Sequence, residues 1–86
     1  MNLHVTKHFN AKCLEEKISD QMNQAIDMHL GGFFEDALKI YKSILKLQPN
    51  HIEANYNVGV IEIILGRPRE ALKFFLSSVE AQPNSP

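Results

Sequence analysis

The fold of this chain is decided by two consecutive stretches, ISDQMNQAIDMHLGGFFEDALKIYKSILKLQPNH at residues 18–51 and IEANYNVGVIEIILGRPREALKFFLSSVEAQPNS at residues 52–85. They are offset by 34 residues and are identical at ten positions. The identities include a glycine, an Ala-Leu-Lys run and a Gln-Pro-Asn run: Gly32 and Gly66, 37–39 and 71–73, 48–50 and 82–84. A fixed period of roughly 20 to 50 residues is typical of stacked repeats, in which each unit buries its apolar face against its neighbours.

The spacing of apolar residues predicts helices and no strand. From about residue 11 to about residue 30, apolar side chains recur every three or four positions, with Asn10 as the N-cap and Gly31-Gly32 as the end. The preceding residues, 1–10, show no clear period and are expected to form a leader segment. Three further helices are expected at about 34–47, about 51–65 and about 69–81.

Prolines and polar caps separate the later helices. Pro49 and Pro83 follow the second and fourth helices, because proline cannot continue a helix. Asn50 and Glu53 form a capping box that starts the third helix. That helix is apolar on nearly every side, so we expect neighbours to enclose it. The prediction is an all-α fold of two antiparallel helix pairs stacked side by side.

The composition limits the classes of function. The 86 residues form one small domain, and a formal net charge of −1 argues against a nucleic-acid or membrane partner. There is no apolar run of about 18 residues and no recognisable secretion signal. The single cysteine, Cys13, cannot form an intramolecular disulfide, which favours a reducing, cytoplasmic setting.

The repeat resembles the tetratricopeptide (TPR) family. The positions that carry the resemblance are small, glycine, aromatic and proline residues: Ala25, Gly32, Ala37, Tyr41 and Pro49, then Gly59, Gly66, Ala71, Phe75 and Pro83. The resemblance implies a right-handed α-solenoid, with the leader and the start of the first helix at 1–17 and repeats at 18–51 and 52–86. At the end of the second repeat, Ser85-Pro86 has the form of a helix start, so a further helix and a longer array are expected.

The resemblance also assigns roles within the units. Ala25 and Gly59 would lie where the helices of a pair cross closely, and Tyr41 and Phe75 would fill the space between successive pairs. The chain departs from the family pattern at several helix positions, where it has Gln21, Gln24, Met28, Asn55 and Glu62. The first helix of the first repeat therefore matches the family weakly.

In the family, the first helices of successive repeats line a concave groove that accepts an extended peptide or a partner helix. The resemblance implies that ten residues face this groove: Ser19, Met22, Asn23, Ile26, His29, Glu53, Tyr56, Asn57, Val60 and Ile64. We therefore expect a protein-interaction scaffold whose partner is a protein or peptide. The groove would be largely apolar, which suits an uncharged segment or an amphipathic helix.

Asn23 and Asn57 are candidate ligands for a peptide backbone. A primary amide offers a donor and an acceptor, so two amides at one repeat spacing could bind a backbone whatever its side chains. This arrangement, with the Asn57-Val58-Gly59 run, resembles the TPR region of O-linked N-acetylglucosamine transferase-type proteins. The alternative interpretation is that both asparagines are merely solvated.

Two further functions stay open at this point. The chain could be the N-terminal recognition module of a longer, glycosyltransferase-like enzyme. It could also be a self-assembly unit, because Phe74, Leu76 and Val79 on the last helix are expected to be partly exposed. A second groove chemistry in the family, which clamps a C-terminal carboxylate, is disfavoured because the groove positions carry no lysine or arginine.

No constellation in the sequence indicates catalysis, a metal or a cofactor. His4 and His8 would share a helix face, but two ligands make a poor metal site. Arg67, Arg69 and Lys73 form a basic edge that is typical of a solvated face. The sequence contains no phosphate-binding loop and no nucleophile elbow, so we do not expect an enzyme.

Overall fold

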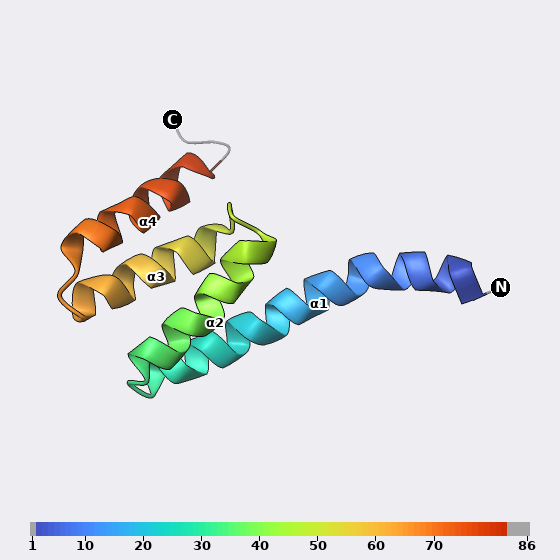
Figure 1. The fold of residues 1–86 in the computed structure, drawn as a ribbon, viewed down its shortest axis with the longest axis horizontal. Coiled ribbons are helices and arrows are strands. Elements are labelled where there is room, and N and C mark those ends of the chain that lie inside the picture. The colour runs from blue at the N-terminus through green and yellow to red at the C-terminus, as the bar shows by residue number, and fades with distance from the viewer. Residues whose placement is uncertain (1, 83–86) are drawn as a thin grey trace.

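The structure is a computed structural model that describes residues 2–82, with side chains described for residues 13–82. Four helices follow one another: α1 (Asn2–Leu30), α2 (Phe34–Leu47), α3 (Ile52–Ile64) and α4 (Pro68–Glu80). Within the described residues there is no strand, and the fold is all-α, as predicted. Figure 1 shows two helical hairpins, α1 with α2 and α3 with α4.

The later helix boundaries agree with the prediction to within one residue, whereas the start of α1 does not. Helix α1 begins at Asn2, so residues 2–10 are helical and Asn10 is not an N-cap. The physical reason is that residues 2–30 contain neither glycine nor proline, so nothing interrupts a helix once it has formed. The first part of α1 extends well beyond the other helices (Figure 1).

Some predicted features lie outside the described residues. They are the stop at Pro83 and the helix start at Ser85-Pro86. The side chains of His4 and His8 also lie outside them.

The two hairpin turns have the same construction. Gly32 and Gly66 have positive φ angles of 85° and 79°, a conformation that glycine adopts without steric cost. Phe33 N donates to Met28 O at 2.8 Å, and the matched bond runs from Arg67 N to Glu62 O at 2.7 Å. These bonds, from a residue to the carbonyl five positions earlier, form a Schellman motif that satisfies the last carbonyls of the helix.

Helix α3 starts from His51 rather than Asn50. The His51 backbone is extended, and its Nδ1 accepts a hydrogen bond from Ala54 N at 3.1 Å. The imidazole thus satisfies an N–H that the helix leaves unpaired, and the capping box predicted for Asn50 and Glu53 is wrong. The Asn55 amide ties α3 to the preceding turn, since its Nδ2 donates to both Pro49 O and His51 O at 3.0 Å.

Packing follows chain order, with α1 against α2, α2 against α3 and α3 against α4. One cluster of buried residues runs through these contacts: Ile18, Met22, Ala25, Ala37, Leu38, Tyr41, Ile44, Ala54, Val58 and Ile61. Together with Ala71 on α4, the alanines Ala25 and Ala37 have no exposed surface, as expected for close helix crossings.

Gly59 lies at an especially close crossing of α3 and α4. A Cβ atom at this position would lie 2.5 Å from the nearest ring atom of Phe75, which only a shift of the ring could relieve. Tyr41, by contrast, connects the two hairpins, because its hydroxyl oxygen accepts a hydrogen bond from Asn57 Nδ2 at 3.1 Å. Phe75 packs within its own hairpin, against Gly59 and Tyr56.

Helices α2 and α4 both pack against α3, yet they do not enclose all of its apolar residues. Ile63 and Ile64 are about half exposed, at 51% and 50%. The contacts of α3 with α2 and α4 therefore leave these two isoleucines open to solvent in the described part of the chain.

A buried carboxylate joins the two hairpins. The Glu62 side chain is only 2% exposed, and its Oε1 accepts a hydrogen bond from Arg67 Nε at 2.6 Å. Arg67 Nη2 lies 3.6 Å from Glu35 Oε2 on α2, and Lys42 Nζ lies 3.9 Å from Glu62 Oε2. The hydrogen bond to Glu62 raises the pKa of the Arg67 guanidinium above its ordinary value. The turn between α3 and α4 is therefore bound to α2 by charge.

Candidate functional site

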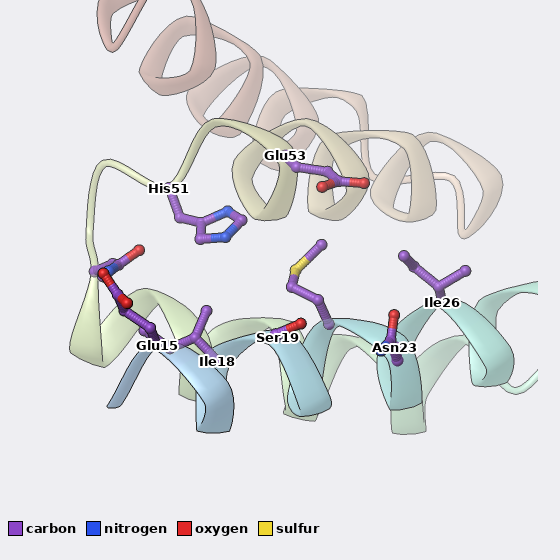
Figure 2. Close-up of a pocket in the computed structure, with 9 residues that line it drawn as sticks. Glu15, Ile18, Ser19, Asn23, Ile26, His51 and Glu53 are labelled. Atoms are coloured by element: carbon purple, nitrogen blue, oxygen red, sulfur yellow. The ribbon is translucent and has the colours of Figure 1, made fainter. Parts of the chain in front are cut away.

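A cleft of about 430 Å³ lies between α1 and the beginning of α3. Residues from α1, from the turn after α2 and from the start of α3 line it: Glu15, Ile18, Ser19, Met22, Asn23, Ile26, Gln48, His51 and Glu53. Figure 2 shows the α1 side chains pointing toward His51 and Glu53, which lie on the opposite wall. The cleft therefore spans the junction of the two hairpins.

The α1 wall has an apolar floor and a polar rim. Ile18 and Met22 are buried, at 5% and 6% exposure, and Ile26 is half-buried beside them. Ser19 and Asn23 are exposed at the edge. These residues share one face because residues three and four apart lie next to each other on a helix.

The opposite wall brings an imidazole and a carboxylate to the cleft. His51 Nδ1 is occupied as the acceptor of the Ala54 N–H, so in the neutral ring Nε2 carries the proton. Glu53 is exposed, as is Glu15 on the α1 side. The described lining residues therefore include two carboxylates and no lysine or arginine.

The structure brings five of the ten predicted groove residues together: Ser19, Met22, Asn23, Ile26 and Glu53. Within this set Met22 belongs to the buried core and forms the floor, rather than offering a free side chain. The cleft thus contains four of the five predicted α1 residues and one predicted residue from the first turn of α3.

The other predicted groove residues lie elsewhere. His29 packs edge-on to Phe34, with ring centroids 5.9 Å apart. Tyr56 packs against Phe75 of α4, at 5.6 Å. Val60 is half-buried and Ile64 is half exposed, and neither lines the cleft.

The two asparagines of the predicted ladder have different surroundings. Asn23 is exposed on the rim of the cleft, whereas Asn57 gives its amide hydrogen to the buried Tyr41 hydroxyl. Burial raises the pKa of Tyr41 above its ordinary value, the Asn57 hydrogen bond lowers it in part, and the Glu53 carboxylate raises it. The two amides are therefore not equivalent.

The sequence interpretation missed four lining residues: Glu15, Ile18, Gln48 and His51. Helical spacing contained a signal for two of them, because Glu15 and Ile18 precede Ser19 and Met22 by four residues on the same face. Gln48 and His51 belong to the turn after α2, and only the tertiary fold brings that turn to α1.

The three α4 residues that were expected to be partly exposed differ in their degree of exposure. Leu76 and Val79 are exposed, at 51% and 53%, but Phe74 is half-buried against the core and lies 5.8 Å from Lys42 Nζ. Leu72, on the same helix, is 57% exposed. Leu72, Leu76 and Val79 are spaced by four and three residues, so they form one stripe.

No protein-family model matches this chain, and no curated protein matches it at a significant level. None of the helices in the described part is long and apolar enough to cross a membrane. The described residues also contain no group of three or more metal-ligating side chains placed to hold an ion.

Proposed function

We propose that this chain is a protein-interaction module of the TPR type, and that it binds a segment of a partner protein in the cleft between α1 and α3. Three features support the TPR-type architecture. The helices pack in chain order, the two hairpin turns recur at 34-residue spacing, and small residues occupy the close crossings. Repeats of this kind function through the surfaces that successive units form together.

The observation that carries the proposal is the composition of the cleft. An apolar floor of Ile18, Met22 and Ile26 offers burial to one or two apolar side chains of a ligand. The rim amide of Asn23 and the Ser19 hydroxyl can hydrogen-bond a peptide backbone. A concave apolar surface with a few polar groups is typical of a site that binds by side-chain anchoring and orients its ligand by hydrogen bonds.

The charge of the cleft restricts the partner. Glu15 and Glu53 lie on opposite walls, and the described lining residues offer no cation to balance them. An acidic segment would bring like charges together, whereas a neutral or basic one would not. The proposed ligand is therefore an extended or helical segment with apolar anchors and no excess of acidic residues.

Selection from a displayed random-peptide library would test this function. The wild-type chain is expected to enrich peptides that pair an apolar residue with Lys or Arg. Asn23→Trp would fill the cleft and abolish binding of the enriched peptides. Gln24→Trp is the matched control, because Gln24 is exposed on the same helix but does not line the cleft.

Two results would contradict the proposal. One is equal binding of the enriched peptides to wild type, Asn23→Trp and Gln24→Trp. The other is an amide chemical-shift map in which the peptide perturbs α4 and leaves Ser19, Asn23 and Glu53 unchanged.

A further inference from the structure

The apolar stripe on α4, formed by Leu72, Leu76 and Val79, has no covering element among the described residues. All three side chains are more than half exposed. They follow one line along the helix and span about 10 Å, at about 1.5 Å per residue. The cleft is separate from this stripe, because its lining residues come from α1, α3 and the turn between α2 and α3.

The matched face in the first unit shows what kind of element covers such a stripe. The residues 34 positions earlier on α2 are Leu38, Lys42 and Leu45. Leu38 is buried and Leu45 partly buried against the core, because α3 lies over this face of α2. The stripe on α4 is therefore the surface that the fold elsewhere covers with a helix.

Helix α1 of another copy is a poor candidate for that cover. On α3, the residues Val58 and Ile61 are fully buried. Their matched residues on α1 are Gln24 and Asp27, and both are exposed. A head-to-tail contact would press an amide and a carboxylate onto leucines, which costs free energy unless the polar groups find partners.

We propose instead that the stripe is an interface with a second copy of this chain, in which the two α4 helices pair antiparallel about a twofold axis. A twofold contact is self-complementary, so each leucine stripe covers the other. Leu76 would meet Leu76 of the second copy near the axis, and Leu72 would meet Val79 of the second copy on either side.

Charge complementarity selects the antiparallel orientation. Arg69 and Glu80 are both exposed, and they flank the same edge of the stripe at its opposite ends. Antiparallel pairing places Arg69 beside Glu80 of the second copy, twice per dimer. Parallel pairing about a twofold axis would instead place this edge of the two copies on opposite sides of the interface, so Arg69 would have no Glu80 beside it.

The charged pair and the apolar stripe are centred at nearly the same place along α4. The midpoint between Arg69 and Glu80 falls between residues 74 and 75, and the midpoint between Leu72 and Val79 falls between 75 and 76. These centres differ by one residue, about 1.5 Å along the helix, so one twofold axis serves both. Such a dimer would leave both clefts open and would present two binding sites to a partner.

Sedimentation equilibrium of the wild-type chain over a concentration series tests the association. The expected result is a mass that rises from monomer to dimer with concentration. Leu76→Lys copies the residue found at the matched position, Lys42, and is expected to weaken dimerisation at least about a hundredfold, because two charges would meet at the axis. Gln24→Lys, with the same added charge on α1, is expected to dimerise as wild type does.

Charge reversal tests the orientation. Arg69→Glu and Glu80→Arg are each expected to weaken dimerisation about tenfold, and the double variant is expected to restore it, because two symmetry-related pairs are inverted together. Circular dichroism of each variant checks that the helices are retained. Independent losses with no recovery in the double variant would overturn the antiparallel pairing.

Cysteine cross-linking gives a second readout of the same geometry. In a Cys13→Ser background, Leu76→Cys is expected to form a symmetric disulfide dimer. Leu72→Cys and Val79→Cys are expected to cross-link only when the two variants are mixed. Self-linking at all three positions would indicate a parallel pair, and a wild-type mass that stays monomeric at high micromolar concentration would overturn the proposal as a whole.

Discussion

Gln21 and Asn55 occupy matched positions in the two units, yet their side-chain amides differ in hydrogen bonding. Asn55 is buried and gives its two amide hydrogens to carbonyls of the turn between α2 and α3. Gln21 has a buried Oε1 atom with no hydrogen-bond partner in the described part of the chain. The amide of Asn55 can bond back to a preceding turn, whereas residues 2–20 before Gln21 are helical and offer no such turn.

Met28 and Glu62 are a second matched pair, and they differ in charge and in burial. Met28 is partly exposed, at 37%, whereas Glu62 is buried among Arg67 and Lys42. One of the two ion pairs of Glu62 is with Lys42, which belongs to the preceding hairpin. A buried carboxylate is tolerated in the second unit because cations from two elements neutralise it.

The largest expected effect comes from separating Glu62 from its cation. Arg67→Met leaves a carboxylate buried with Lys42 alone nearby, and should give the greatest loss of thermal stability among these variants. Glu62→Met in the Arg67→Met background, which reproduces Met28, should restore most of it. Thermal unfolding followed by circular dichroism measures both. If Arg67→Met unfolds at the wild-type temperature, the network does not hold the hairpins together.

The next effect concerns the close crossing at Gly59. Gly59→Ala introduces a Cβ atom 2.5 Å from the Phe75 ring, although the matched residue Ala25 accommodates one. We expect a loss of about 2 kcal/mol, since overpacking outweighs the better helix propensity of alanine. Urea unfolding gives the value, and Phe75→Leu in the Gly59→Ala background should recover part of it. A stabilised Gly59→Ala variant would contradict the close contact.

Replacing the matched amides Asn55 and Gln21 should change the free energy of unfolding by a smaller amount, and in different directions in the two units. Asn55→Leu removes both hydrogen bonds to the turn and should cost about 1–2 kcal/mol. Gln21→Leu removes a buried oxygen without a partner and should be neutral or slightly stabilising. Chemical denaturation measures the free energy of unfolding of both variants. Equal losses would contradict the statement that only the Asn55 amide stabilises the fold.

The smallest expected effect on stability comes from the ionisation of Tyr41, which lies between the two hairpins. Burial raises the pKa of Tyr41 above its ordinary value of 10.0, so its neutral form favours the folded state. This contribution to stability is complete below about pH 10 and is lost as the pH rises further, through the folded-state pKa. Asn57→Ala should raise the pKa of Tyr41 again, because the amide hydrogen bond lowers it. Ultraviolet titration in a Tyr56→Phe background isolates Tyr41, and a lower pKa in the variant would contradict the hydrogen bond.

Local signals made most of the fold predictable. Apolar spacing, two glycines and the prolines located α2, α3 and α4 to within one residue, because these features act within a few positions. The start of α1 was missed because residues 1–10 show no clear apolar period, although residues 2–30 contain no glycine or proline to interrupt a helix. The cap at His51 was missed because histidine is a rarer cap than the neighbouring Asn50.

The family resemblance predicted the α1 wall of the cleft better than the opposite wall. It implied Ser19, Met22, Asn23 and Ile26 on α1, which all line the cleft, but only Glu53 among its α3 residues does so. Tyr56 and Asn57 depend on tertiary partners, Phe75 and Tyr41, that draw them away from it. Contacts of this kind, between segments that are distant along the chain, cannot be predicted from a single sequence.

The repeated Schellman turn has a consequence for how the chain acquires its structure. Each turn closes a hairpin from residues that are neighbours in sequence, and every helix packs mainly against the next one along the chain. Contacts of such short range cost little loop-closure entropy, so folding is expected to be fast. Because the two turns are alike in geometry, either hairpin can form first and serve as the template on which the other condenses.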